Sequence, residues 1–333
     1  MIVGPSGKSI PLTIIFMSQP TRQLFGTDGI RGVAGEFPLT RESTYLIGRA
    51  LGHDLMRTAP SAAVIFGQDT RESSQWIADR VALGLASVGV EVHSAGVITT
   101  PGVAYLARSR KFAAGVVISA SHNPWTDNGI KVFSGDGFKL PDAHELAIER
   151  EIFSLLEDPP EEAAVSKPPA PSLPGEASLR EAYIEWLSQN VSADLSALHV
   201  LVDCANGAAT AEAPALFRAL GIQARFLHAA PSGKNINAGC GALHPETVAK
   251  AVADSAGKYG LGVTFDGDAD RALFCDSAGR GQWRRCASAV RSRSAGAWQA
   301  GGSDRGGDHD VEHGLRDCAE TLGHPFAARK CGR

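Results

Sequence analysis

The first residues of this chain whose types suggest chemistry lie in a short polar turn at 119–124. An apolar run from Gly115 to Ile118 ends there in two serines, a histidine and an asparagine, and Pro124 closes the turn. Buried strands of α/β proteins often end in this way where they deliver a reactive group to a cleft. A serine hydroxyl needs a base or a covalent phosphate to react. Ser121 is therefore a candidate nucleophile, although serine- and asparagine-rich turns are also common as ordinary loops.

A second group of reactive residues is the acidic loop that contains Asp266, Asp268 and Asp270. Gly267 and Ala269 separate the three carboxylates, and every second side chain of an extended segment points the same way. Such carboxylates repel one another unless a cation lies among them. All-oxygen ligation suits Mg²⁺, which usually keeps a coordination position for a phosphate oxygen. The loop therefore predicts a magnesium site. The alternatives are a solvated acidic turn and a calcium loop, but the glutamate that closes an EF-hand loop is missing.

The serine turn and the acidic loop together indicate phosphoryl transfer. His122 and Asn123 can donate hydrogen bonds to phosphate oxygens, and Lys131 can neutralise their charge. Arg31 lies in a glycine-rich stretch and can bind phosphate with two parallel hydrogen bonds, although a surface salt bridge would also account for it. The segment GQDTRESS at 67–74 suits helix capping and anion binding equally well. No GxSxG motif is present, which argues against an acyl-transfer hydrolase.

The composition of the chain narrows its class. A length of 333 residues suits two or three domains, and a hydrophobic content of 44% is ample for globular cores. The net charge of -4 provides no general attraction to nucleic acid or anionic membranes, so we expect neither as a partner. The six cysteines include no CxxC pair and no signal peptide is evident, which together predict reduced thiols and a cytoplasmic protein.

Short apolar runs that alternate with helical patterns predict two α/β units with mainly parallel or mixed sheets. In the first unit, 17–157, we expect a helix at 73–87 and strands at 62–66, 90–93, 113–119 and 130–133. In the second unit, 177–280, we expect helices at 179–189, 211–220 and 246–258 and strands at 200–203, 224–227 and 261–265. A cluster of prolines at 158–176 predicts a linker without a packed element.

The first residues of the chain are not expected to belong to the fold. Met17 is the expected start, and residues 1–16 are the expected product of upstream sequence. The segment GPSGKS at 4–9 imitates a phosphate-binding P-loop, but Ile2 occupies the position of the first glycine. The apolar run at 10–17 is too short to span a bilayer.

These motifs, taken together, resemble the α-D-phosphohexomutase superfamily. The resemblance covers about residues 21–277, and its matching segments are FGTDGIRG at 25–32, GQDTRESS at 67–74, ISASHNPWTDNGIKVF at 118–133, VDCANGAA at 202–209, NINAGCGALHPE at 235–246 and DGDADR at 266–271. The fifth segment and Ala269 favour the glucosamine branch of the superfamily. The phosphomannomutase/phosphoglucomutase branch is the alternative.

The resemblance implies two consecutive phosphohexomutase α/β domains, one with a phosphoserine loop and one with a metal loop. It implies interconversion of glucosamine 6-phosphate and glucosamine 1-phosphate, a small phosphosugar, through glucosamine 1,6-bisphosphate. Ser121 would carry the phosphate and, with Asp266, Asp268 and Asp270, would hold one Mg²⁺. Charge stabilisation or proton transfer would fall to Arg31, His122 and Lys131, and phosphate or substrate binding to Asn123 and Arg271.

The sequence departs from the superfamily after about residue 280. Two further domains are expected there, with a sugar-recognition loop and a C-terminal phosphate-binding loop, but 281–333 is poor in large apolar residues and rich in arginine and glycine. Permitted codons for 281–288 and 306–318, read one base later, encode VNGDAVL and VVTTMSNMGFEI. We therefore expect a frameshifted tail and a C-terminally truncated chain whose activity is doubtful. The second alternative is a catalytically dead fragment that binds phosphosugar or metal.

One apparent metal site in the tail is expected to be accidental. His309 and His313 are four residues apart and lie near Cys318 and Cys286, which imitates a zinc site. If the tail is frameshifted, this spacing has no functional meaning.

Overall fold

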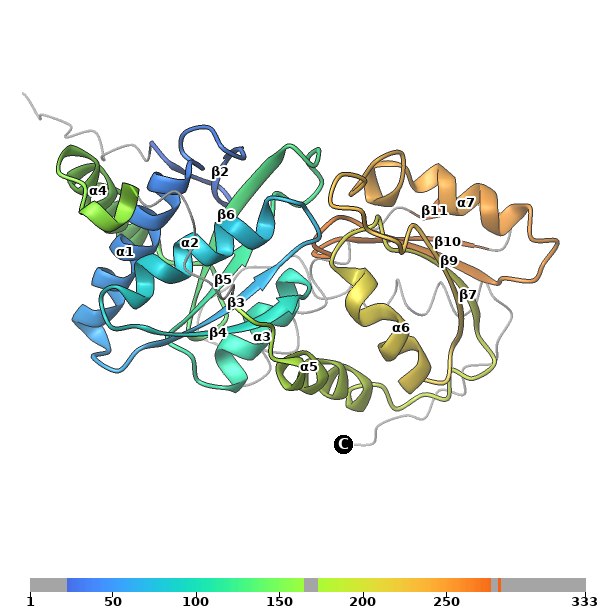
Figure 1. Ribbon diagram of the computed structural model, residues 1–333. Coiled ribbons are helices and arrows are strands. Elements are labelled where there is room, and N and C mark those ends of the chain that lie inside the picture. The colour runs from blue at the N-terminus through green and yellow to red at the C-terminus, as the bar shows by residue number, and fades with distance from the viewer. Residues whose placement is uncertain (1–22, 165–172, 277–280, 283–333) are drawn as a thin grey trace, which may run out of the picture.

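The computed structural model describes residues 23–164, 173–276 and 281–282. These residues form two α/β/α units that lie side by side, the first blue to green and the second yellow to orange in Figure 1. The extension predicted at 1–16, the tail from 283 with its histidine and cysteine spacing, and 165–172 of the predicted linker lie outside the described residues.

The first unit is built on a mixed sheet of six strands in the order β1-β2-β6-β5-β3-β4. Strand β3 pairs in parallel with β4 and β5, whereas β6 is antiparallel to β5 and β2. The strands are β1 Phe25–Gly26, β2 Gly29–Val33, β3 Ala63–Gln68, β4 Glu91–Val97, β5 Ala114–Ile118 and β6 Asp127–Ser134. Every residue of β5 is buried, as expected for a central strand covered on both faces.

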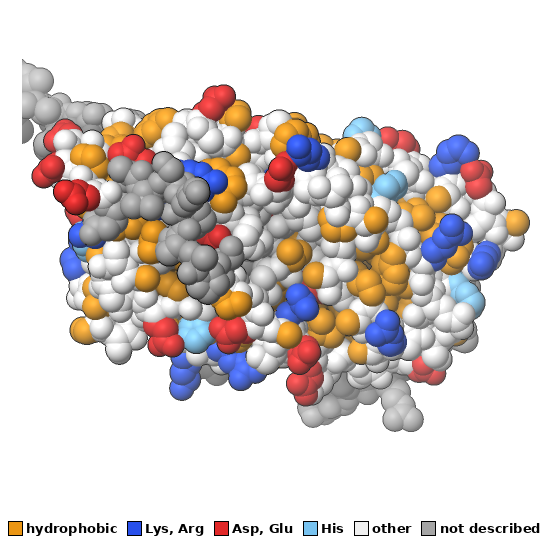
Figure 2. Space-filling view, viewed as in Figure 1, with side chains coloured by type: hydrophobic (Ala, Val, Ile, Leu, Met, Phe, Trp, Pro, Cys, Tyr) orange, Lys and Arg blue, Asp and Glu red, His pale blue; other side chains and the backbone are white. Residues whose placement is uncertain are grey.

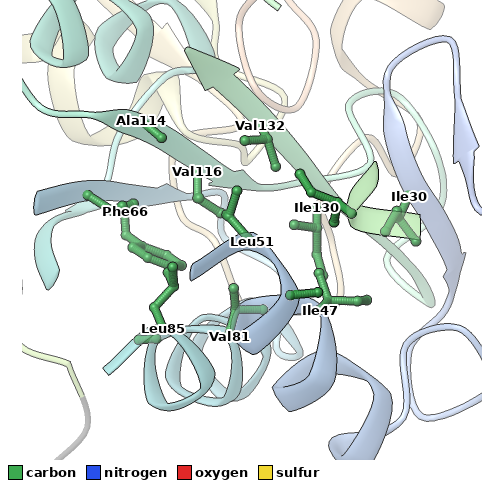
Figure 3. Packing of buried hydrophobic residues seen from close by; sticks show 14 of the residues in the cluster. Ile30, Ile47, Leu51, Phe66, Val81, Leu85, Ala114, Val116, Ile130 and Val132 are labelled. Atoms are coloured by element: carbon green, nitrogen blue, oxygen red, sulfur yellow. The ribbon is translucent and has the colours of Figure 1, made fainter. Parts of the chain in front are cut away.

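Helices cover both faces of this sheet. The helices of the first unit are α1 Arg41–Thr58, α2 Ser74–Ala86, α3 Thr100–Ser109 and α4 Asp142–Glu157. Helices α1 and α2 pack on one face, where Figure 3 shows Leu51 and Leu85 directed toward Phe66 and Val116 of the strands. Helix α4 lies against α1, and α3 contacts the opposite face along β3 and β5.

The second unit has a mixed sheet in the order β11-β10-β9-β7-β8. Its strands are β7 His199–Asp203, β8 Gln223–Leu227, β9 Leu261–Phe265, β10 Ala272–Asp276 and β11 Gly281–Gln282. Helix α6, Ala209–Ala219, and helix α7, Pro245–Ala253, pack against separate hydrophobic clusters of the sheet. Hydrophobic side chains gather over this unit on the face shown in Figure 2, consistent with the partly exposed residues packed against the α6 cluster.

Helix α5, Ala177–Gln189, connects the two units structurally. Its buried side chains Leu179 and Tyr183 join a core cluster with Ile98 and Val103 of the first unit. Its other contacts include α6 of the second unit. The same helix therefore covers the second face of the first sheet and supports the junction between the units (Figure 1).

The predicted elements agree with the structure in type, with two corrections. Helix α7 ends at Ala253 rather than at 258, because Ala256 and Gly257 adopt left-handed backbone conformations with φ of 52° and 82°. The prediction that 158–176 holds no packed element is wrong at η1, Glu161–Ala164. Ala163 is buried there against α1, and its carbonyl accepts a hydrogen bond of 2.7 Å from Arg80 Nη2. None of the helices in the described part of the chain has both the length and the apolar content that a membrane span requires.

A buried carboxyl group near α5 predicts a pH dependence of stability. Glu212 of α6 lies close to Tyr183 and Arg180, and burial raises its pKa from 4.5 to about 7. The folded chain therefore binds this proton more tightly than the unfolded chain, and the free energy of unfolding should fall as pH rises from about 5 to 8. The effect should approach about 3 kcal/mol. Chemical denaturation at several pH values should show a flatter profile for Glu212→Gln, and parallel profiles would contradict this assignment.

Candidate active site

The serine turn and the acidic loop meet at the junction of the two units. Ser121 Oγ donates a hydrogen bond of 2.6 Å to Asp266 Oδ2, across 145 residues of sequence. Ser121 is 1% exposed, and its backbone is left-handed, with φ of 55°. Its amide donates to Ser119 Oγ at 2.9 Å. Non-glycine residues in this backbone region are uncommon and cluster at functional sites, because the surrounding structure must stabilise them.

A tight turn, rather than an extended segment, gathers the three aspartates. The amide of Ala269 donates to the carbonyl of Asp266 at 3.0 Å, and the amide of Arg271 donates to Asp266 Oδ1 at 3.1 Å. Ligand atoms of Asp266, Asp268 and Asp270 all lie within 4.8 Å of one another. The predicted cluster is thus present, but the alternation argument for it was wrong, because Ala269 has a left-handed backbone with φ of 54°.

A lysine from the first unit offsets part of the negative charge of this cluster. Lys131 Nζ lies 2.6 Å from Asp268 Oδ2 and 3.6 Å from Asp270 Oδ2. Burial alone would lower the pKa of Lys131, but Asp268 and Asp270 outweigh it and raise the pKa. Lys131 lowers the pKa of Asp268 despite burial, whereas burial and the two other carboxylates raise the pKa of Asp266 well above its usual value. One carboxyl of the group therefore lacks a compensating charge.

The cluster fits a small divalent cation. The Oδ1 atoms of Asp268 and Asp270 are buried and have no hydrogen-bond partner, and Arg271 Nε lies 3.8 Å from that of Asp270, beyond hydrogen-bond distance. Unpaired buried carboxylate oxygens are costly unless a cation or donor reaches them. Three oxygen donors, with Ser121 Oγ beside them, are the hard ligand set that Mg²⁺ prefers. The aspartates are therefore a possible Asp-rich metal site of the kind that the sequence predicts.

His122 lies beside the serine hydroxyl and is close to two arginines, Arg31 and Arg271. His122 Nδ1 lies 3.5 Å from Ser121 Oγ and 3.3 Å from Arg271 Nη1. Burial, together with Arg271 and Arg31, lowers the pKa of His122. The imidazole is therefore neutral near pH 7, and its Nδ1 can accept a proton. Arg31 makes an exposed ion pair with Asp28 at 3.3 Å, while its Nε is buried without a hydrogen-bond partner.

Asn123 differs from the expectation in how its groups are used. Its side-chain amide donates to Oδ2 of Asp127, the first residue of β6, at 2.9 Å. Its carbonyl accepts a hydrogen bond of 2.7 Å from Arg71 Nη2. In this structure Asn123 thus shapes the serine turn, and its phosphate-binding role stays a prediction.

Two groups of residues at the site were not among the individual site residues expected from the sequence, although one of them lies in GQDTRESS at 67–74, for which the sequence suggested helix capping or anion binding. Thr100, at the start of α3, donates from Oγ1 to Asp268 Oδ2 at 2.5 Å and from its amide to the Asp268 carbonyl at 3.0 Å. Asp69 accepts hydrogen bonds from Ser119 Oγ at 2.6 Å and Ser74 Oγ at 2.8 Å, and it forms a buried ion pair with Arg71. The segment 67–74 therefore stabilises the serine turn through these hydrogen bonds. Polar residues at the ends of β3 and β4 were the available signal.

A second cluster of potential metal ligands has a structural explanation. Asp203, His228 and Cys240 lie close together in the second unit. The Asp203 carboxylate already accepts hydrogen bonds from the amides of Ala205 and Gly241 and contacts His228 Nδ1 at 3.0 Å. Burial raises the pKa of the Cys240 thiol to about 12, so it is protonated at neutral pH. These contacts hold the loop that follows β8 against the end of β7.

Comparison with known proteins defines the class of this chain. The model of phosphoglucomutase/phosphomannomutase α/β/α domain I matches residues 22–158, and that of domain II matches residues 181–279. A crystal structure of a phosphoglucomutase/phosphomannomutase family protein from Burkholderia thailandensis aligns with a TM-score of 0.65 at 26% identity, over 78% of this chain and 56% of that one. The chain belongs to the phosphoglucomutase/phosphomannomutase family.

Within that family, the chain is similar to phosphoglucosamine mutases. It is 57% identical to the phosphoglucosamine mutase of Koribacter versatilis over 79% of this chain and 57% of the relative. It is 52% identical to that of Solibacter usitatus over 78% of this chain and 56% of the relative. The chain thus spans little more than half the length of the curated relatives it matches.

The carboxylate cluster predicts a specific response to magnesium. Asp266→Asn should remove a buried negative charge that the neighbouring carboxylates repel. In EDTA at pH 8 the melting temperature of this variant should therefore be about 3 °C above that of the unmodified chain, equivalent to roughly 1 kcal/mol. Saturating Mg²⁺ should stabilise the unmodified chain, by about 2.7 kcal/mol at a hundredfold excess over Kd, but not the variant. Thermal unfolding with and without Mg²⁺ measures both effects.

Asp254→Asn provides the matched control. Asp254 is an exposed carboxylate directly after α7, paired with Lys250 and outside the carboxylate cluster. This variant should keep the magnesium response. Equal responses of both variants would exclude the acidic loop as the binding site.

Proposed function

We propose that this chain is the phosphate-carrying half of a phosphoglucosamine mutase. Its first domain, 17–157, would supply the phosphoserine Ser121, its second domain, 177–280, would supply the metal ligands, and 158–176 would link them. The observation that carries the proposal is the 2.6 Å hydrogen bond from Ser121 Oγ to Asp266, which joins a nucleophile of one domain to the carboxylates of the other. The similarity to phosphoglucosamine mutases supports glucosamine over mannose or glucose as the sugar.

In the proposed reaction, the phosphate on Ser121 passes to a hydroxyl of the phosphosugar. The P–Oγ bond breaks as a bond from phosphorus to the sugar oxygen forms, and the proton of the sugar hydroxyl passes to Ser121 Oγ, which gives glucosamine 1,6-bisphosphate and free serine. Ser121 then attacks the other phosphate of this intermediate and releases the isomeric monophosphate. Neutral His122, with Nδ1 3.5 Å from Oγ, is placed to accept the serine proton in that step.

The remaining charged residues would bind and neutralise the transferring phosphate. Arg31 and Arg271 lie close enough to His122 to lower its pKa, and His122 Nδ1 in turn lies 3.5 Å from Ser121 Oγ. Lys131 keeps Asp268 ionised. Mg²⁺, held by Asp266, Asp268, Asp270 and the Ser121 side, would supply further neutralisation of phosphate charge when bound. Asn123 would complete the phosphate contacts.

The proposed ligand is a small phosphosugar, and the proposed location is the cytoplasm. The three cysteines in the described part of the chain, Cys204, Cys240 and Cys275, are free, as expected for reduced thiols. The proposal includes no nucleic-acid or membrane partner.

Transfer of phosphate to Ser121 tests the proposed function directly. The purified chain, incubated with Mg²⁺ and glucosamine 1,6-bisphosphate, should gain one phosphate by intact-mass analysis, and peptide mapping should place it on Ser121. Ser121→Ala should lose the modification entirely, because the acceptor oxygen is gone. Ser119→Ala is the control and should still acquire phosphate, because Ser119 Oγ binds Asp69 and the Ser121 amide but is not the proposed phosphate acceptor.

The sugar specificity follows from the reverse transfer. The phosphorylated chain should pass its phosphate to glucosamine 6-phosphate faster than to mannose or glucose 6-phosphate. A preference for mannose or glucose phosphate would favour the phosphomannomutase/phosphoglucomutase alternative. A chain that binds Mg²⁺ but never acquires phosphate would be a catalytically dead remnant.

A further inference from the structure

Two side chains from different domains bind the same pair of carbonyl groups in the serine turn. Asn237 Nδ2, from the loop after β8, donates to the carbonyls of Ser121 at 2.9 Å and Asn123 at 3.2 Å. Arg71 Nη2, from the first domain, donates to the same carbonyls at 3.2 and 2.7 Å. Both side chains are largely buried, and neither has a place in the reaction described above.

The loop that carries Asn237 is itself fixed to the second domain. The backbone amide of Asn237 donates to the Ala205 carbonyl at 2.9 Å, and the Asn237 backbone is left-handed with φ of 57°. Asn206 Nδ2 donates to the carbonyl of Asn235 at 3.2 Å. The Asn237 side-chain amide therefore contacts the serine turn from a loop that hydrogen bonds hold to the second domain.

The acidic loop leaves no space for the serine turn to move toward it. A Cβ atom at Gly267 would lie 2.4 Å from the Ser121 carbonyl oxygen and 2.9 Å from Asn237 Nδ2. The peptide that follows Ser121 is thus enclosed by Arg71, Asn237 and the Gly267 backbone. The Ser121 side chain, by contrast, is directed at the carboxylate cluster, where its Oγ donates to Asp266.

We propose that Asn237 is a positioning residue for Ser121. By holding the carbonyls of Ser121 and Asn123 from the second domain, it fixes the left-handed serine backbone and thereby the place of Oγ relative to the aspartates. Docking of the second domain and alignment of the nucleophile are then one event. The consequence for phosphate transfer rests on the proposed function, but the restraint on the backbone does not.

Because Arg71 and Asn237 donate to the same two carbonyls, the positioning role of Asn237 can be tested separately from its contribution to folding. In Asn237→Ala, Arg71 still donates to both carbonyls, so no buried acceptor loses its last partner and the cost in stability should be small. The serine turn should nevertheless gain freedom. A displacement of about 1 Å at a reacting group can reduce a rate by roughly a hundredfold.

The experiment combines two measurements on the full chain. Hydrogen–deuterium exchange reports the opening of amides 119–123, and intact mass reports the rate of phosphorylation by glucosamine 1,6-bisphosphate with Mg²⁺. Asn237→Ala should accelerate exchange in this segment about tenfold. It should slow phosphorylation at saturating bisphosphate by about 10- to 100-fold, with a much smaller change in the half-saturating concentration.

Two further variants separate hydrogen bonding from packing. Asn237→Asp keeps the shape but replaces a donor with an oxygen that repels the carbonyls, so at pH 8 it should be at least as impaired as Asn237→Ala. Asn235→Ala is the matched control in the same loop, because within the described part of the chain the Asn235 side chain bonds Ala230 and Ser232 and not the serine turn. It should leave both measurements unchanged.

Each result decides the proposal. Faster exchange and slower phosphorylation in both Asn237 variants, but not in Asn235→Ala, would support it. Unchanged exchange at 119–123, or faster exchange with an unchanged rate, would overturn it. If the unmodified chain is never phosphorylated, the proposed function fails, and the exchange measurement still decides whether Asn237 restrains the serine turn.

Discussion

The buried ion pair between Lys131 and Asp268 is the contact on which the rest of this site depends. Its atoms are 2.6 Å apart, and the two side chains are 8% and 1% exposed. Buried charges of this kind must stay paired, because separating them leaves an uncompensated charge that costs several kcal/mol. Lys131 lies in β6 of the first domain and Asp268 in the loop after β9 of the second. The pair therefore ties the docking of the domains to the charge balance of the aspartates.

Around this pair, two strands end at the reacting groups, and two others end at residues that hold the neighbouring loops in place. Strands β5 and β9 end at the same junction and deliver Ser121 and the aspartates. The segments after β3 and β7 carry no reacting group. Asp69, just after β3, accepts a hydrogen bond from Ser119 of the serine turn, and Asp203, the last residue of β7, accepts one from the Gly241 amide in the loop that follows β8. Residues of this second kind explain why a serine with a strained backbone keeps one position.

Helix α5 adds a contact between the domains that is independent of the site. Its aromatic residues Tyr183 and Trp186 pack against Tyr105 of α3, with ring centroids 5.6 and 4.2 Å from it. The buried carboxyl of Glu212 lies beside the same helix. Apolar packing at α5 and charge pairing at the acidic loop therefore stabilise one domain arrangement through different forces.

The sequence by itself determined the α/β class, most strands and the main chemical groups, because these depend on local patterns. The apolar runs before Ser119 and Asp266 ended in polar turns, as buried strands do where they reach a site. Helix ends were less certain, since left-handed residues such as Ala256 carry no distinct local signal. The tertiary structure alone decided that Thr100, Arg71 and Asn237 belong to the site. Their roles arise from carbonyls and carboxylates more than 50 residues away in most cases, and no periodicity or spacing records such contacts.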